Sequence, residues 1–449
     1  MDTPFRPMHP IVRPIAWPVM WMPVEMGSPN MDAFEIDWDD PSRLETLLQI
    51  IDRGVAAILG RALTCQELGS GDGLTLARST GLEMEALVLA ADRVRRQRVG
   101  DVVTYVVNRN INFTNVCFVG CRFCAFSRAP REGDAYFMSL EEVARRSKEA
   151  WDRGAREVCV QGGLPRGLDP YYYRDLLRAI KQATPGMHTH AFSPMEIVYG
   201  VELTGMKLPD YLTMLKDAGL DTLPGTAAEI LDDSVRHDIE RIKLKVAEWV
   251  EVVKTAHKLG IRTTSTMMYG HMETGEHWLR HLILLRDIQK ETGGFTEFVP
   301  LGFVHQNTQL YLSGDARPGP TPEEHLKVHA LARLMLQGWI DNIQVSWVKL
   351  SAAMSQACLR AGANDYGGTL MDENISRLAG STSGEYLSPE EFHDRIRAIG
   401  RIPAERNTMY KIVKKMPYGM EGDPALPMDQ EATSSSPLAS QDVRLLGVR

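Results

Sequence analysis

A short run of cysteines is the part of this sequence that most directly predicts chemistry. Cys117, Cys121 and Cys124 fall within eight residues, although the 449-residue chain has six cysteines in all. Thiolates are soft ligands that select iron–sulfur clusters, zinc or cuprous copper. Three ligands in one loop can hold a cubic [4Fe-4S] cluster by one corner and leave its fourth iron open. We therefore predict such a cluster. Structural zinc is the alternative, but no second closely spaced Cys or His pair occurs to complete it.

A second candidate site follows the next predicted strand along the chain, which ends in Gln161, Gly162 and Gly163. Glycines at this position allow a positive φ or a close backbone approach to a ligand, and a glutamine side chain both donates and accepts hydrogen bonds. The triplet therefore predicts a ligand contact, and a tight turn without a ligand is the alternative.

Polar side chains also lie at most of the other predicted strand ends. In a barrel of alternating strands and helices, catalytic groups collect at the carboxyl ends of the strands, so we expect many of these residues to contact a substrate or cofactor. The candidates are His190, Ser193, Glu196, Thr226, Glu229, Tyr269, His271, Glu273, His305, Gln344, Ser346, Lys349, Asn364, Asp365, Glu373 and Asn374.

The elements that must position these residues alternate between short apolar runs and helical periodicity. This alternation predicts an α/β fold, a TIM-type (β/α)8 barrel, with a six-unit partial barrel and two accessory elements as the alternative. Strands are predicted at 111–117, 157–163, 188–193, 221–225, 262–270, 294–303, 340–348 and 365–370, and helices at 139–153, 171–183, 208–218, 245–259, 276–292 and 322–337.

The remainder of the chain divides into flanking segments. We expect a loosely ordered extension at 1–43, a helical lead-in at 44–107, the barrel at 108–410 and a flexible tail at 411–449, which is rich in Ser, Pro and acidic residues. Cys65, Cys159 and Cys358 stand apart from the cluster motif and are expected to be small buried apolar residues.

Composition excludes several classes of function. The formal net charge of -8 argues against a nucleic-acid partner. No apolar run is long enough to span a membrane, and no compact signal peptide is present, so a cytoplasmic location is expected.

The cysteine motif, with the aromatic Phe123 before the third cysteine, resembles the CxxxCxφC signature of the radical S-adenosylmethionine (SAM) superfamily, where φ is aromatic. The resemblance implies that SAM chelates the open iron and that an external one-electron donor drives its cleavage to a 5′-deoxyadenosyl radical. It also implies that Gln161–Gly163 contact the methionine part of SAM. Ser193 and Glu196 are further SAM-binding candidates, and Tyr269, His271, Glu273 and His305 are the catalytic candidates.

Longer blocks make the resemblance narrower. The chain resembles the CofH family of this superfamily in the blocks 108–126 (NRNINFTNVCFVGCRFCAF), 157–163 (EVCVQGG), 190–197 (HAFSPMEI), 224–231 (PGTAAEIL), 266–274 (TMMYGHMET), 293–305 (GGFTEFVPLGFVH), 346–350 (SWVKL) and 362–376 (GANDYGGTLMDENIS).

Membership of that family would imply a definite reaction. L-tyrosine is cleaved at its Cα–Cβ bond, its 4-hydroxybenzyl group is added to 5-amino-6-(D-ribitylamino)uracil, and 2-iminoacetate is released. Because the sequence contains one radical SAM cysteine motif, a separate CofG-like radical SAM partner is expected to close the ring of the 5-deazaflavin FO, the chromophore of coenzyme F420. The alternative is a neighbouring enzyme of menaquinone biosynthesis, aminofutalosine synthase or the dehypoxanthine futalosine cyclase.

Overall fold

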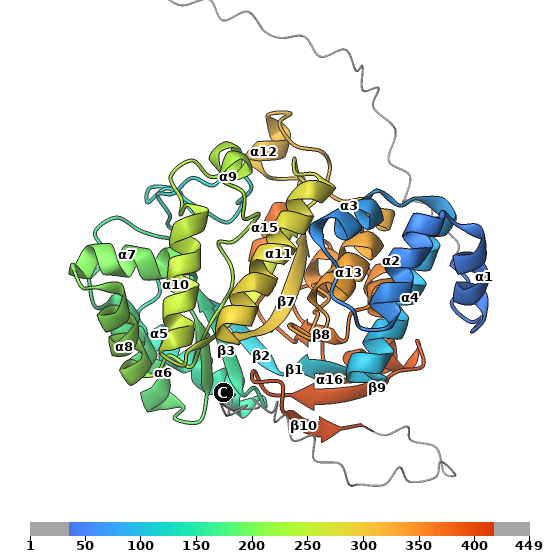
Figure 1. The fold of residues 1–449 in the computed structure, drawn as a ribbon. Helices are drawn as coiled ribbons and strands as arrows, with labels where there is room; N and C mark the ends of the chain where they lie inside the picture. Colours follow the sequence, from blue (N-terminus) through green and yellow to red (C-terminus); the bar gives the residue numbers. More distant parts are fainter. Residues whose placement is uncertain (1–35, 417–449) are drawn as a thin grey trace, which may run out of the picture.

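The computed structural model describes residues 36–416, and within that range the chain folds around two sheets (Figure 1). The larger sheet has six parallel strands in the order β2-β3-β4-β5-β6-β7, and the smaller one has the order β10-β9-β1-β8. The strands are β1 (Val102–Val106), β2 (Asn108–Asn112), β3 (Glu157–Gln161), β4 (His188–Ala191), β5 (Thr222–Leu223), β6 (Arg262–Tyr269), β7 (Phe295–Gly302), β8 (Asp365–Gly368), β9 (Ile402–Arg406) and β10 (Ile412–Lys415).

Helices follow the strands of the larger sheet and cover its outer face, while four helices precede it (Figure 1). The leading helices are α1 (Arg43–Ile50), α2 (Arg53–Leu63), α3 (Ser70–Arg78) and α4 (Gly81–Val99). The others are α5 (Leu140–Asp152), α6 (Tyr172–Ala183), α7 (Pro194–Thr204), α8 (Leu208–Ala218), α9 (Asp233–Ile239), α10 (Val246–Lys258), α11 (Gly275–Thr292), α12 (Gln309–Leu312), α13 (Pro322–Leu336), the 3-10 helix η2 (Trp347–Lys349), α14 (Ala352–Arg360), α15 (Ile375–Ala379) and α16 (Pro389–Arg397).

Local sequence explains why several helices begin where they do. Ser193, Thr321 and Ser388 each cap a helix, each is followed by proline, and each is matched by a glutamate three residues later. This capping box satisfies backbone N–H groups that the first helical turn leaves without partners. The strands behave differently: β6 is buried at every position after its first residue, as expected of a parallel strand covered on both faces.

The (β/α)8 arrangement needs correction, whereas the alternative of a six-unit partial barrel is confirmed. Residues 340–348 form no regular strand; Ile343 and Gln344 make single bridges to Phe298 and Asp365 before the chain turns into η2. The segment after β8 lies against β2 instead, since Asn110 N donates to Leu370 O at 2.8 Å. These irregular segments span the gap between β7 and β2.

The expected helical lead-in contains α1–α4 but also ends in a strand, because Val102–Val106 form β1 between β8 and β9. β-branched residues and burial on both faces favour this conformation. Helix α4 packs against α13 and α3 packs against α11, so the lead-in covers one side of the partial barrel. Of the expected extension and tail, residues 1–35 and 417–449 lie outside the described residues.

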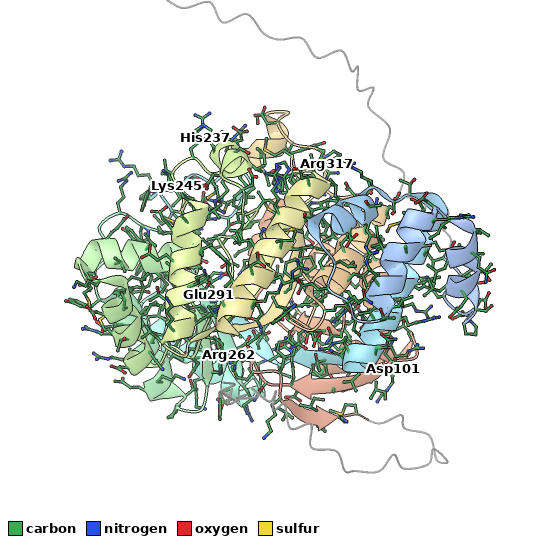
Figure 2. The ribbon with its side chains drawn as sticks, in the orientation of Figure 1. Asp101, His237, Lys245, Arg262, Glu291 and Arg317 are labelled. Carbon is green, nitrogen blue, oxygen red and sulfur yellow. The ribbon has the colours of Figure 1, made fainter. Side chains whose placement is uncertain are left out.

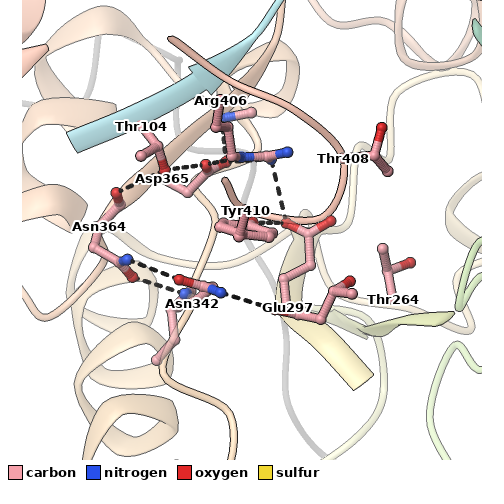
Figure 3. A network of polar contacts seen from close by, with 12 residues as sticks. Thr104, Thr264, Glu297, Asn342, Asn364, Asp365, Arg406, Thr408 and Tyr410 are labelled. Carbon is pink, nitrogen blue, oxygen red and sulfur yellow. Dashed lines mark hydrogen bonds and ion pairs between the residues drawn. The ribbon is translucent and has the colours of Figure 1, made fainter. Parts of the chain in front are cut away.

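A buried polar network closes the end of the partial barrel at which the strands begin (Figure 3). Arg406 reaches from the end of β9 to both carboxylate oxygens of Asp365, at 2.5 and 3.0 Å, and lies 3.7 Å from Glu297. Tyr410 donates its hydroxyl hydrogen to Glu297, and Thr408 donates to Glu157 at 2.5 Å. The segment after β9 therefore plugs this end of the molecule.

The opposite end carries the loops that lead from strands to helices. In Figure 2, Lys245, the N-cap of α10, lies near the upper end, whereas Arg262, the first residue of β6, and Glu291, near the end of α11, lie lower. The strands thus run upward, and their carboxyl ends gather at the upper end. None of the helices within residues 36–416 is long and apolar enough to cross a bilayer.

Candidate functional site

A cavity of about 260 Å³ lies at the carboxyl ends of the strands. The cysteine loop and the Gln-Gly-Gly turn meet at this cavity, together with residues from β2 and β7, the two edge strands of the larger sheet. The polar and sulfur-containing residues of its lining include Cys117, Cys121, Cys124, Gln161, Ser193, Glu196, Thr226, Glu229, Lys243 and Lys349, together with the backbone of Gly162 and Gly163.

The loop that carries the cysteines follows β2 and is held by hydrogen bonds at both ends. Thr114 Oγ1 donates to Tyr136 O at 2.6 Å, and Asn115 Nδ2 donates to Asp134 O at 2.9 Å. Cys117 N donates to Arg128 O at 3.1 Å. These contacts bring the two ends of the loop together, so the sulfur atoms are held at the cavity without a regular element beneath them.

The three thiols are free and partly exposed, and their surroundings fit an iron–sulfur cluster. Burial raises the pKa of the Cys121 and Cys124 thiols, and the N–H groups of Phe126 and Ser127 act in the opposite direction at Cys124. A bound metal stabilises the thiolate form outright, and N–H groups directed at sulfur are typical of cluster sites.

Within residues 36–416, no group of three Cys, His, Asp or Glu side chains converges closely enough to bind one metal ion. Cys65 differs from its expected environment, because it lies exposed after α2, whereas Cys159 is half-buried and Cys358 is buried. Cys65 is at a positive φ of 59°, which places it in a turn rather than in the core.

The Gln-Gly-Gly turn is packed directly against the cysteine loop. A Cβ atom at Gly163 would lie 2.3 Å from Val116 O and 3.0 Å from Cys117 Cβ, and one at Gly162 would lie 2.4 Å from the Phe113 ring. Glycine is therefore required here for close approach. Both glycines line the cavity beside Cys117, and their N–H groups are held within the protein, by Glu196 Oε1 at 3.1 Å and by Thr114 O at 2.8 Å.

Glu196 connects this turn to the first turn of α7. Its carboxylate accepts hydrogen bonds from Gly162 N at 3.1 Å, from Ser193 N at 2.7 Å and from Ser193 Oγ at 2.8 Å. Burial raises the pKa of Glu196 to about 7, although these hydrogen bonds oppose the shift. The predicted residues Ser193 and Glu196 thus reach the cavity wall as a helix cap that fixes Gly162.

An acidic and basic cluster forms the wall beside Cys121. Lys243 Nζ lies 2.5 Å from Glu229 Oε1 and 3.1 Å from Glu240 Oε2, and it sits 5.1 Å from the centroid of the Phe123 ring. Burial alone would lower the pKa of Lys243, but the two carboxylates outweigh it and raise that pKa. Nearby, Gln161 Nε2 donates to Thr226 Oγ1 at 2.6 Å.

Lys243 was missed by the sequence analysis, since it lies in an irregular segment between α9 and α10 and follows no strand. No local pattern marks it. The last residue of α9 is bound to the cysteine loop, where Arg122 N donates to Ile239 O at 2.9 Å, and this contact brings the segment that follows α9 to the cavity.

The four predicted catalytic residues do not line the cavity. Tyr269 is buried, and its hydroxyl lies 2.7 Å from His325 Nδ1. Glu273 accepts hydrogen bonds from Gly270 N at 2.6 Å and His271 N at 2.9 Å, which holds the turn after β6. His305 packs edge-on against Tyr311, with ring centroids 4.4 Å apart. Of their neighbours, Met268 and Phe303 line the cavity, and the Phe303 ring packs edge-on against His271, with ring centroids 6.0 Å apart.

Comparison with known proteins identifies both halves of the barrel region. Residues 111–285 match the radical SAM superfamily, and residues 292–419 match the CofH/MqnC C-terminal region. Among solved structures, methylornithine synthase (PylB) has a TM-score of 0.60 at 19% identity over 77% of this chain and 97% of its own. The hydrogenase maturase HydG has a TM-score of 0.64 at 14% identity over 82% and 79%. These likenesses show the shared partial-barrel fold.

Two relatives are much closer in sequence. FO synthase of Nocardia farcinica is 54% identical over 369 residues, which are 82% of this chain but 42% of that longer protein, so the chain spans less than half of this relative. The 5-amino-6-(D-ribitylamino)uracil–L-tyrosine 4-hydroxyphenyl transferase of Methanocaldococcus jannaschii is 50% identical over 352 residues, which are 78% of this chain and 98% of that protein. Because a relative of this identity is matched over nearly its whole length, the chain belongs to the radical SAM superfamily and, within it, to the CofH family of transferases.

Proposed function

We propose that this chain transfers the 4-hydroxybenzyl group of L-tyrosine to 5-amino-6-(D-ribitylamino)uracil and releases 2-iminoacetate, the CofH step in the formation of the deazaflavin FO. The observation that carries the proposal is the 50% identity to the Methanocaldococcus jannaschii transferase over 98% of that protein. The cavity supports it, because its wall draws on both matched regions: the cysteines come from the first, and Lys349, Ile375 and Ala379 come from the second.

Membership of the superfamily implies a [4Fe-4S] cluster and SAM. We propose that Cys117, Cys121 and Cys124 hold three irons of the cluster and that SAM takes the fourth, with its methionine part against Gly162 and Gly163. When bound there, the cluster supplies the electron that cleaves SAM and so starts radical chemistry. The residues of this chain orient the ligands and exclude water.

Within that arrangement, the wall residues have distinct tasks. Glu196 holds the Gly162 N–H through a hydrogen bond of 3.1 Å and so fixes the turn beside the cluster loop. The Lys243–Glu229 pair, at 2.5 Å, keeps a paired charge beside Cys121 in place of bulk water. A catalytic role for Tyr269, His271, Glu273 and His305 stays a prediction, and here these side chains would act through the turn and wall they support.

The proposal also requires partners. This chain matches 42% of the longer FO synthase of Nocardia farcinica, and we propose that a CofG-like radical SAM enzyme acts with it to close the ring of FO. An external one-electron donor must reduce the cluster.

Substitution of a single cysteine tests the cofactor assignment. Cys121→Ala should abolish cluster iron and SAM cleavage. It should leave the melting temperature nearly unchanged, because the substitution removes a single sulfur atom from a partly exposed side chain at the cavity. Cys65→Ala is the matched control, since Cys65 is free and exposed. Iron and sulfide content after anaerobic reconstitution, together with 5′-deoxyadenosine formation, are the measurements. Global unfolding of Cys121→Ala would favour structural metal instead.

The transfer reaction is tested by supplying both substrates to the reduced enzyme with SAM. Detection by mass spectrometry of an adduct formed from tyrosine and ribitylaminouracil supports the proposal. Formation of product only from an enolpyruvyl-benzoate substrate would assign the chain to the menaquinone branch, which shares the C-terminal region.

A further inference from the structure

One cation in the cavity wall has no assigned task. Lys349 is the last residue of η2 and lines the cavity. Its Nζ donates a hydrogen bond to Ser376 Oγ at 3.0 Å, and no carboxylate among residues 36–416 forms an ion pair with it. An ammonium group has three donors, so donors of Lys349 remain for a ligand.

The two carboxylates that face Lys349 are engaged elsewhere. Glu373 accepts hydrogen bonds from Asn110 Nδ2 at 2.9 Å and from Ser376 N at 2.5 Å, and Glu229 pairs with Lys243. Burial lowers the pKa of Lys349, although both carboxylates oppose the shift. An ammonium group that is half-buried and has no ion pair loses part of its hydration, and an incoming anion would offset that loss.

The backbone that carries Lys349 is firmly fixed. Trp347 is 2% exposed, and its Nε1 donates to Gly368 O at 2.9 Å. Leu350 N donates to Trp347 O at 3.1 Å, and Ser381 donates its hydroxyl hydrogen to Val348 O. The turn that carries Lys349 is thus anchored to β8, and the hydrogen bond to Ser376 Oγ orients the ammonium group.

We propose that Lys349 binds the α-carboxylate of the amino-acid substrate. This assignment rests on the proposed function. Two bound ligands would bring a carboxylate into the cavity, the amino-acid substrate and SAM. The methionine part of SAM, which carries its carboxylate, is assigned to the Gly162–Gly163 turn beside Cys117. Lys349 belongs instead to the wall formed by the C-terminal region, with Ile375 and Ala379. The other lysine in the lining, Lys243, is already paired with two carboxylates.

Equilibrium binding to the reconstituted, SAM-loaded protein tests this assignment with two ligands that differ by one group. L-tyrosine carries the carboxylate and tyramine lacks it. The wild-type protein should prefer tyrosine by roughly 10- to 100-fold, as hydrogen bonds to charged groups typically give. Lys349→Met should lose this preference, and Lys349→Arg should retain most of it. Lys411→Met is the matched control, since Lys411 is exposed. Melting temperatures of all variants establish that they are folded.

The outcomes separate the two proposals. A tyrosine preference that survives in Lys349→Met overturns the carboxylate assignment, as does a wild-type protein that does not distinguish tyrosine from tyramine. A variant that keeps the preference but loses affinity for SAM shows that the anion is the carboxylate of SAM, which also overturns it. If wild-type protein binds tyrosine with the expected preference but never forms the uracil adduct, the proposed function alone has failed.

Discussion

Among single residues, the glycines of the Gln-Gly-Gly turn shape the cavity because they have no Cβ atom. Gly163 lies against Val116 and Cys117, so that a Cβ atom would meet backbone at 2.3 Å. The sequence predicted this glycine turn and the cysteine loop, because both have local signatures. It did not predict Lys243, which is brought to the cavity by a segment more than a hundred residues after the cysteine loop, and no local pattern encodes such a contact.

The close approach of Gly163 leads to a prediction. Gly163→Ala should push the backbone of Val116 and Cys117 away, because a carbonyl group cannot yield as a flexible side-chain end can. We expect a loss of about 1–3 kcal/mol in the free energy of unfolding and a lower iron content after reconstitution. Gly133→Ala is the control, since a Cβ atom there meets nothing within 4 Å. Iron analysis that finds full cluster content in Gly163→Ala would contradict the proposed packing.

At the scale of elements, four inner strands (β3, β4, β6 and β7) and the six expected helices lie close to their predicted positions. The first barrel strand does not: it was predicted at 111–117, but β2 spans Asn108–Asn112, and the residues after it form the irregular loop that leads to the cysteines. Strands β1 and β9, helix α7 and the region after β7 were also not predicted. Helix α7 is buried on most of its surface, so its sequence shows little contrast between two faces. Its capping box of Ser193 and Glu196, with Pro194 between them, is the local signal that could have identified it. Residues 340–348 have the composition of a strand, but η2 and the contact of Trp347 with Gly368 override that preference.

Helix α7 carries Glu196, so its packing should matter for the site. Gly200 faces Tyr211 of α8, and a Cβ atom there would lie 1.9 Å from the tyrosine hydroxyl oxygen and 2.3 Å from the ring carbon that bears it. Gly200→Ala should therefore force α7 away from α8 and destabilise the protein by about 1–3 kcal/mol.

The control lies in α2, where a Cβ atom at Gly60 meets nothing within 4 Å. Gly60→Ala should stabilise the protein by up to about 1 kcal/mol, because alanine is the better helix former. Urea denaturation measures both changes. Equal effects of the two substitutions would show that α7 does not pack as described.

At the scale of the whole molecule, the two ends of the partial barrel differ. One holds the cavity, and the other is closed by buried pairs between residues far apart in sequence, such as Arg406 with Asp365 and Thr408 with Glu157. Such pairs have no signature in a single sequence, because each partner looks like an ordinary polar residue. The alternation of strand-like and helical segments predicted an α/β barrel. It did not predict how the gap between β7 and β2 is filled, or how the end at which the strands begin is closed.

The buried polar network at the end where the strands begin makes the stability of the protein depend on pH. Burial raises the pKa of Glu297 from 4.5 to about 7, although Arg406 opposes the shift. The folded chain therefore holds a proton that the unfolded chain releases in this window. The stabilisation by that proton is complete below pH 4.5 and is lost as the pH rises to about 7.

Glu297→Gln removes this titration and keeps an acceptor for Tyr410. Between pH 5 and 8, the free energy of unfolding of the wild-type protein should fall relative to that of Glu297→Gln by about 1–3 kcal/mol. Chemical denaturation at several pH values measures the difference. Parallel curves for the two proteins, or a difference that grows in the opposite direction, would contradict the assignment.

The fate of labelled tyrosine distinguishes transfer of the hydroxybenzyl group from every other outcome. The reduced, SAM-loaded enzyme is given ribitylaminouracil and tyrosine carrying ¹³C at Cα or, separately, at Cβ, and the products are analysed by mass spectrometry. We expect the Cβ label to enter the uracil product and the Cα label to leave in 2-iminoacetate, recovered as glyoxylate. Both labels in one product, or SAM cleavage without transfer to the uracil, would contradict it.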